Sequence, residues 1–182
     1  MSAPLLRSLA RDASAYAALG GWWGNLGFWV VATYRLGAWA KTLPLPLRLP
    51  ILVVYGLLRL PWHLFLHVEL PASARIGAGL LLVHPYNVLI GPEAQLGDDC
   101  SIFHEVTVGA GPSPGMPRIG DRVALFAGAR VLGGIEVGDG SEVGANCVVT
   151  IDVSPGSIVA PPQARAIPKK LLRPGEKSAA QR

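Results

Sequence analysis

The chain has 182 residues, a formal net charge of +4 and 51% hydrophobic residues. This length suits one main domain with an accessory segment. The basic residues do not form a patch interleaved with aromatic side chains, so nucleic acid binding is not expected. The two cysteines have neither Cys-X-X-Cys nor zinc-ligand spacing, which argues against a disulfide framework and a bound metal. We therefore expect a protein of a reducing compartment, the cytoplasm.

Residues 1–68 are predicted to form an apolar helical segment. All five tryptophans lie in this part, and residues 13–34 carry no charge. Pro44 and Pro46 indicate a turn between two helical pieces. Such a segment could cover an open end of the following domain, join subunits, or lie on the inner face of the cytoplasmic membrane as a peripheral contact. The sequence leaves these three roles open.

The second half of the chain repeats an aliphatic residue at every sixth position. Neither an α-helix nor an ordinary strand has this period, which indicates stacked units of a parallel β-helix. A coil of three repeats places residues 18 apart about one strand spacing, ~4.8 Å, above each other. We expect roughly five coils. A glycine after the aliphatic residue should give backbone freedom at the corner. A small residue four positions after the aliphatic residue should lie inside the prism. The aliphatic positions are Ile90, Leu96, Ile102, Val108, Ile119, Leu125, Val131, Val137, Val143 and Val149.

The repeat is broken twice, and the extra residues must leave the prism as loops. The step from Leu82 to Ile90 is eight residues, and the step from Val108 to Ile119 is eleven. Loops on a rigid scaffold are where binding and catalytic groups usually lie. The two breaks are therefore the expected places for a functional site.

Two histidines mark the expected site. His84 lies in the first break, and both His84 and His104 stand two positions after an aliphatic repeat position, one coil apart. Their imidazoles are therefore expected on the same side of the prism, near each other. Glu69 lies at the base of the coil that carries His84 and could orient that imidazole. This combination suits general-base chemistry near neutral pH.

Six stretches of this sequence resemble the catalytic domain of serine O-acetyltransferases, within the hexapeptide-repeat acyltransferase superfamily. The resemblance implies a left-handed parallel β-helix, a homotrimer with active sites between subunits, and acetyl-CoA as the acyl donor without a metal. The fold expected for the chain is thus an all-β left-handed β-helix preceded by an α-helical segment. The matching stretches are residues 68–70, 74–77, 84, 88–91, 101–109 and 133–138.

The same resemblance implies roles for individual residues. His84 matches the catalytic general base of the family, and Glu69 matches its carboxylate partner. Positions that contact the cofactor in the family correspond to Ala110, Ala127 and Ala145, and Gly128 adjoins them. We expect His104, Glu105 and Asn87 to shape the acceptor site.

Three positions depart from the family pattern. Gly115 and Met116 stand where the family has an arginine and a histidine that bind the carboxylate of the amino acid, and Val83 replaces an acidic residue. These losses favour an acceptor other than serine. We therefore predict an acetyl-CoA-dependent O-acetyltransferase that modifies a hydroxyl of a glycan or lipid-linked sugar in bacterial exopolysaccharide or surface-glycan biosynthesis.

Three other functions stay open from the sequence. The first is serine O-acetyltransferase of cysteine biosynthesis. The second is a γ-type carbonic anhydrase on the same fold, which needs a third histidine on the prism. The third is a non-catalytic trimeric scaffold. The expected parts of the chain are a helical segment at 1–68, a β-helix acyltransferase domain at 69–168 and a basic tail at 169–182.

Overall fold

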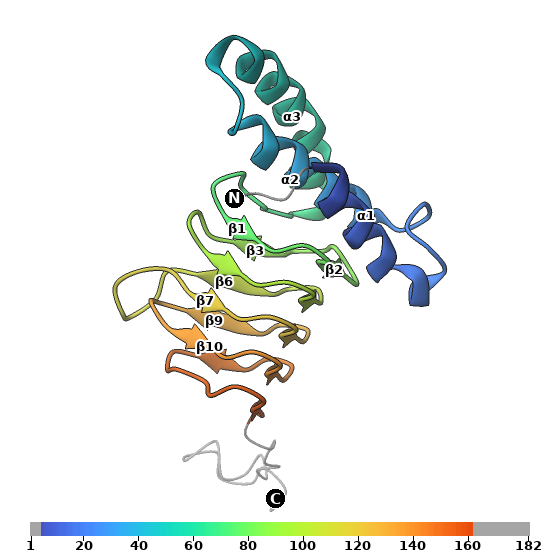
Figure 1. Ribbon diagram of the computed structural model, residues 1–182. Coiled ribbons are helices and arrows are strands. Elements are labelled where there is room, and N and C mark those ends of the chain that lie inside the picture. The colour runs from blue at the N-terminus through green and yellow to red at the C-terminus, as the bar shows by residue number, and fades with distance from the viewer. Residues whose placement is uncertain (1–4, 162–182) are drawn as a thin grey trace, which may run out of the picture.

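The computed structural model describes residues 5–161, which form a helical segment followed by a parallel β-solenoid (Figure 1). The end of the expected β-helix domain, residues 162–168, and the basic tail at 169–182 lie outside the described residues. Every paired strand runs parallel to its neighbours in the coils above and below. The solenoid is the left-handed β-helix expected from the sequence, with three sheets as the faces of a prism.

Each face of the prism is one sheet of short strands. The first sheet contains β1 (Arg75–Ile76), β4 (Gln95–Leu96), β7 (Arg118–Ile119) and β10 (Glu136–Val137). The second contains β2 (Leu81–Leu82), β5 (Ser101–Ile102), β8 (Ala124–Leu125), β11 (Glu142–Val143) and β13 (Ile158–Val159). The third contains β3 (Leu89–Ile90), β6 (Thr107–Gly109), β9 (Arg130–Leu132) and β12 (Val148–Val149).

The strand register confirms the six-residue repeat. Leu89 pairs with Thr107, 18 residues later, where no extra residues intervene. Across the two breaks the separation grows by the number of extra residues, so that Arg75 pairs with Gln95 and Gln95 with Arg118. The ten aliphatic repeat positions are all buried, at 5% exposure or less. The described solenoid has about four turns, slightly fewer than the five expected.

The glycines after the aliphatic positions have a different role from the one expected. Gly97 does not adopt a positive φ, and a Cβ added there would lie 2.6 Å from the backbone carbonyl carbon of Gly120 in the next coil. Glycine is needed at this position because the next coil passes too close for a side chain. The left-handed conformation falls instead two residues later, at the corner, on residues such as Glu93, Asp99, Glu105, Arg122 and Asn146.

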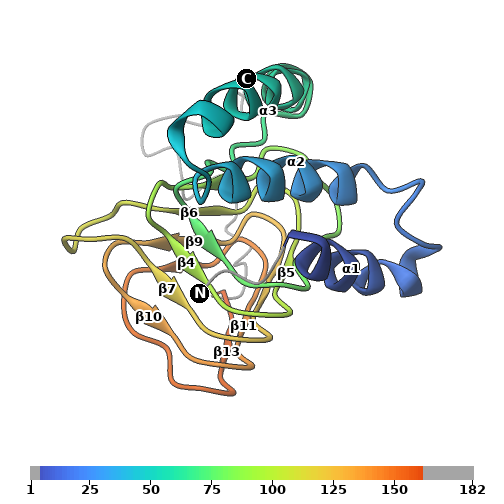
Figure 2. The ribbon, with the colours of Figure 1, turned by 45° about the horizontal axis from the view of Figure 1, so that its top comes forward.

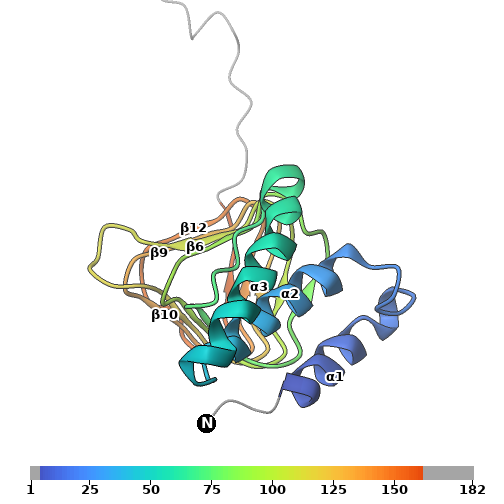
Figure 3. The same cartoon turned by 90° about the horizontal axis from the view of Figure 1, so that it is seen from above.

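Three helices cover the N-terminal end of the solenoid. They are α1 (Leu5–Ala15), α2 (Leu26–Ala40) and α3 (Leu45–Leu66), with a 3₁₀ turn at Ala17–Leu19 between the first two. The turn expected near Pro44 separates α2 from α3, and Pro46 lies in the first turn of α3, where its missing N–H costs nothing. In Figures 2 and 3, α2 crosses the end of the solenoid, α1 lies beside it, and α3 forms the outermost layer.

A buried ion pair joins two helices to the first coil. Asp12 is fully buried, and its Oδ2 accepts a hydrogen bond from Arg35 Nε at 2.8 Å. Asp12 Oδ1 accepts from the backbone N–H groups of Gly79 and Leu80 at 2.8 and 3.1 Å, and Arg35 donates to the carbonyl of Ile76 at 2.6 Å. Backbone groups at an open end of a sheet need partners, because an unpaired buried group is costly.

Tyrosine hydroxyls complete this cover. Tyr34 donates to the carbonyl of Ala74 at 2.9 Å and accepts from the N–H of Ile76 at 3.1 Å. Tyr16 accepts from the N–H of Leu82 at 3.0 Å, and burial raises the pKa of this phenol far above its ordinary value. Of the three roles open for the helical segment, covering the end of the β-helix is confirmed.

Candidate active site

Four of the expected site residues form one column along an edge of the prism. Each stands two positions after an aliphatic repeat position, in the connections from the second sheet to the third. The backbone N–H of Gly128 donates to the carbonyl of His104 at 3.0 Å, and the N–H of Asn146 donates to the carbonyl of Ala127 at 2.9 Å. These bonds hold successive coils in register, so the column has the spacing of stacked strands. The column consists of His84, His104, Ala127 and Ala145.

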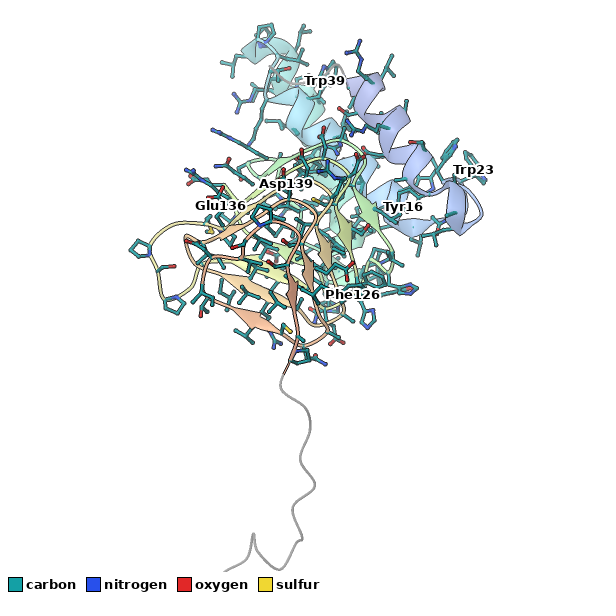
Figure 4. The ribbon with its side chains drawn as sticks, turned by 60° about the horizontal axis from the view of Figure 1, so that its bottom comes forward. Tyr16, Trp23, Trp39, Phe126, Glu136 and Asp139 are labelled. Carbon is teal, nitrogen blue, oxygen red and sulfur yellow. The ribbon has the colours of Figure 1, made fainter. Side chains whose placement is uncertain are left out.

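The two histidines lie next to each other, as expected. The ring centroids of His84 and His104 are 5.8 Å apart, and His84 also meets the edge of Phe103 at 6.4 Å. Phe103 stacks on Phe126 in the next coil at 5.1 Å, so aromatic rings line this edge beside the histidines; Phe126 is labelled in Figure 4. His84 is exposed and His104 is half-buried. The pair therefore presents imidazole nitrogens to a ligand that approaches this edge.

Glu69 makes a different side-chain contact from the one expected. Its carboxylate lies 3.4 Å from Nδ1 of His63, at the end of α3, and both side chains are about half exposed, at 50% and 45%. Within residues 5–161 no hydrogen bond joins Glu69 to His84. The backbone of Glu69 pairs with Val88 and Ile90, so Glu69 lies one coil before the strand that follows the His84 loop. Its orienting role stays a prediction.

Asn87 and Glu105 occupy corners on the same edge. Both are exposed and adopt left-handed φ angles of 53° and 60°. The N–H of Glu105 donates to the carbonyl of Tyr86 at 2.9 Å, which places the two corners in successive coils. Their side chains therefore flank the histidine column from the outside of the prism.

The second break produces a loop on another edge. Residues 110–117 project between β6 and β7, where the third sheet connects to the first (Figure 1). Gly111 packs so closely against Gly133 that a Cβ added to Gly111 would lie 2.6 Å from the backbone nitrogen of Gly133. Ala110 is exposed at the start of this loop, so it does not share the edge of Ala127 and Ala145. The structure thus divides the residues expected to contact the cofactor between two edges.

An open groove of about 590 Å³ lies under this loop and along the first sheet. Its lining includes Met116 and four outward-facing residues, one from each strand of that sheet. Arg75, Gln95, Arg118 and Glu136 stack in register there. Within the described part of the chain, no carboxylate forms a salt bridge with Arg75 or Arg118.

This groove, whose lining holds two arginines beside the carboxylates of Glu93, Glu136 and Asp152, was not anticipated from the sequence. The available signal was weak: a polar residue precedes the aliphatic residue in every third repeat, and only the coil geometry brings these residues together. Among residues 5–161, no group of three or more His, Cys, Asp or Glu side chains is placed to hold a metal ion.

Comparisons with known proteins agree on the repeat and the fold. Residues 116–150 match the family model described as bacterial transferase hexapeptide (six repeats). Serine acetyltransferase from Helicobacter pylori is 43% identical over 105 residues, which is 56% of this chain and 61% of the relative. The chain therefore spans about three fifths of the length of that relative.

Two solved structures share the architecture of the helical segment and the solenoid. Serine acetyltransferase from Brucella abortus in complex with coenzyme A has a TM-score of 0.72 at 29% identity, covering 88% of this chain and 66% of that one. Serine acetyltransferase from Neisseria gonorrhoeae in complex with serine has a TM-score of 0.70 at 26% identity, covering 89% and 68%.

These similarities correct the expected acceptor. Curated relatives that are 33–43% identical to this chain, and the solved neighbours, are named serine acetyltransferase, so the prediction of a polysaccharide O-acetyltransferase is wrong. That prediction rested on Gly115 and Met116, which replace the carboxylate-binding pair of the family, and on Val83, which replaces an acidic residue. The loss did not remove every cation near this loop, since Arg118 and Arg75 line the groove under it together with the carboxylates of Glu93, Glu136 and Asp152.

The relatives' names also give no support to the expected membrane partner. The repeat, the sequence similarity and the shared architecture agree with the resemblance drawn from the sequence, and the fold of this chain is that of the hexapeptide-repeat acyltransferase superfamily.

Proposed function

We propose that this protein is a cytoplasmic serine O-acetyltransferase that uses acetyl-CoA and acts as a homotrimer. One observation carries the proposal: the paired imidazoles of His84 and His104 head a column that continues through Ala127 and Ala145. The similar Brucella abortus protein is a serine acetyltransferase in complex with coenzyme A, and the similar Neisseria gonorrhoeae protein is one in complex with serine.

The edge below the histidines suits an extended ligand that contains amide groups. The backbone N–H groups of Ala127 and Ala145 make no hydrogen bond within the described residues. Both residues are small, at half-buried and exposed positions, so a chain of amides can approach their backbone. Acetyl-CoA laid along this column would receive hydrogen bonds from these donors, and its thioester would lie near His84.

His84 would act as the general base. It takes the proton from the hydroxyl of serine as the oxygen attacks the thioester carbonyl, and the tetrahedral intermediate then collapses with loss of the coenzyme A thiolate. The proton held on His84 passes to that thiolate, so the products are O-acetylserine and free coenzyme A. A positioned base of this kind typically contributes about 10²–10⁴ in rate.

The acceptor carboxylate would bind beside Arg118 in this groove, whose lining also holds the carboxylates of Glu93, Glu136 and Asp152. Arg118 follows the loop of the second break directly, and Arg75 lies two strands away in the first sheet, in register with it. The guanidinium of Arg118, which forms no salt bridge within residues 5–161, can donate two parallel hydrogen bonds to a carboxylate. Arg118 would thus replace the arginine and histidine that the family has at positions 115 and 116.

The homotrimer explains how the two edges can serve one site. Within one chain, the histidine column and the loop at residues 110–117 leave different corners of the prism. A threefold arrangement in which the histidine edge of one copy faces the loop of the next brings base, cofactor and acceptor groove together. Ala110 would then contact the cofactor from the neighbouring copy.

The test measures release of the coenzyme A thiol from acetyl-CoA with L-serine. We expect turnover that depends on serine, a loss of at least about 100-fold in kcat for His84→Ala, and unchanged acetyl-CoA binding by calorimetry. Acetyl-CoA binding with no serine-dependent turnover would refute serine as the acceptor. Absence of acetyl-CoA binding would favour a non-catalytic scaffold.

A second variant tests the acceptor groove. Arg118→Gln should raise the KM for serine about 10–100-fold, the range expected for one charge-assisted hydrogen bond, with little change in kcat. Serinamide, which has no carboxylate, should be used equally well by the variant and the wild type. Equal KM values for serine would show that Arg118 does not bind the carboxylate.

A further inference from the structure

The outer face of α3 is apolar along its whole length and is left exposed by the other residues that the structure describes, 5–161. Val53, Leu57, Leu60 and Leu64 recur at helical spacing and are 63%, 67%, 51% and 56% exposed. α3 is long and apolar enough to cross a membrane, a property that core helices share. In a core helix, however, most of the apolar window is buried, whereas only 6% of it is buried in α3.

The charges of the helical layer indicate what covers this face. Residues 13–68 contain no Asp or Glu, and the charge of Arg35 is neutralised by its buried ion pair with Asp12. Lys41, Arg48 and Arg59 leave the layer net positive. A second copy of α3 would bring like charges together, whereas an anionic lipid surface attracts this arrangement.

Exposed indoles lie before and at the start of α2, in the same helical segment. Trp22, Trp23 and Trp29 contact one another, with ring centroids 5.4–5.9 Å apart, yet they remain 39%, 72% and 37% exposed. Figure 4 shows Trp23 at the outer end of the helical layer, away from the solenoid. Tryptophan favours the boundary between headgroups and acyl chains, because its ring is apolar and its N–H is polar.

The contacts of α3 decide between lying on the membrane and spanning it. Tyr55 is buried and donates to the carbonyl of Leu70 at 3.3 Å, and Trp62 donates to the hydroxyl of Thr33 at 3.0 Å. These bonds tie the inner side of the helix to the first coil and to α2. A helix whose inner side is held by these contacts can immerse only its outer side.

We propose that α3 binds this protein to the surface of an anionic phospholipid membrane, with Val53, Leu57, Leu60 and Leu64 inserted among the acyl chains. The binding is peripheral and reversible, and lipid charge and buried apolar area contribute to it together. It is independent of the proposed acetyl transfer, because α3 contributes none of the residues placed in the catalytic site.

The test is co-sedimentation of the full chain with vesicles of phosphatidylcholine alone and of phosphatidylcholine mixed with phosphatidylglycerol. We expect binding to the anionic vesicles that weakens as salt is added, since surface charge is screened. Leu57→Glu combined with Leu64→Glu should weaken binding by about tenfold or more per leucine, the effect of no longer burying a leucine side chain.

A matched control carries the same change elsewhere. Ile151 and Ile158 are each 73% exposed on the far part of the solenoid, so Ile151→Glu with Ile158→Glu should leave vesicle binding unchanged. No binding by the wild type, or equal loss in both double variants, would overturn the proposal. If the wild type did not bind vesicles and the molecular mass in solution were half as large for the α3 variant as for the wild type, the face would be assigned to a second copy instead. Coenzyme A release with serine, measured on the same samples, separates failure of this proposal from failure of the proposed activity.

Discussion

Removing the carboxylate of Asp12 should have a large effect on folding. In Asp12→Ala, Arg35 keeps its charge at 7% side-chain exposure with no counter-ion, and the N–H groups of Gly79 and Leu80 lose their acceptor. Removing one partner of a buried ion pair typically lowers the free energy of unfolding by about 3–5 kcal/mol, because the remaining charge stays desolvated. We expect the free energy of unfolding to fall by about that amount.

The neighbouring residue supplies a matched control. Arg11, on the same helix, forms ion pairs with Asp98 and Asp99, but these side chains are 43–45% exposed. An exposed pair contributes about 0–1 kcal/mol. Arg11→Ala should therefore lower the free energy of unfolding by no more than about 1 kcal/mol.

Urea unfolding followed by circular dichroism measures both variants. The double variant Asp12→Ala with Arg35→Met should be less destabilised than the sum of the two single variants, because removing both partners leaves no isolated buried charge. Equal losses for Asp12→Ala and Arg11→Ala would refute the argument that burial of the Asp12–Arg35 pair fixes the helices to the first coil.

Two further predictions concern the solenoid. Gly97→Ala should destabilise the protein by about 1–3 kcal/mol, since the added Cβ would meet the next coil. Gly56→Ala in α3 should stabilise it by about 0.5–1 kcal/mol, since a Cβ there meets no atom within 4 Å. Equal effects of the two variants in thermal unfolding would contradict the packing argument. Burial raises the pKa of the Cys100 thiol from 9.0 to about 11, so the folded state favours the thiol form. The stability that this preference contributes is fully present below pH 9.0 and is lost as the pH rises towards about 11. Iodoacetamide should label Cys100 much more slowly in the native protein than in denaturant, and equal rates would show that the thiol is accessible.

The histidine pair could be predicted because it depends on the repeat alone. Once a period of six is identified, His84 and His104 must fall on one edge one coil apart, and their rings do lie 5.8 Å apart. The groove that contains Arg75 and Arg118 could not be predicted in this way. Arg75 and Arg118 are 43 positions apart in the sequence, and they come together only through the register of β1, β4 and β7.

The side-chain partner of Glu69 shows a second limit. Its place in the first coil follows from the sequence, but its contact with His63 depends on where α3 ends against that coil. No local pattern encodes that arrangement. The acceptor was also misjudged from three positions in the two loops, Val83, Gly115 and Met116, because the local sequence does not show which charges of other strands face the same groove.

The sequence by itself determined the solenoid, the burial of its aliphatic positions and the places where loops leave it. These follow from a local period that each hexapeptide carries independently. Only the tertiary structure decided how Asp12, Arg35 and the tyrosines cover the open end, which face of α3 stays uncovered, and which charges line the groove. Each of these depends on contacts between segments distant in the chain, and such contacts are set by packing of the whole molecule rather than by any repeat.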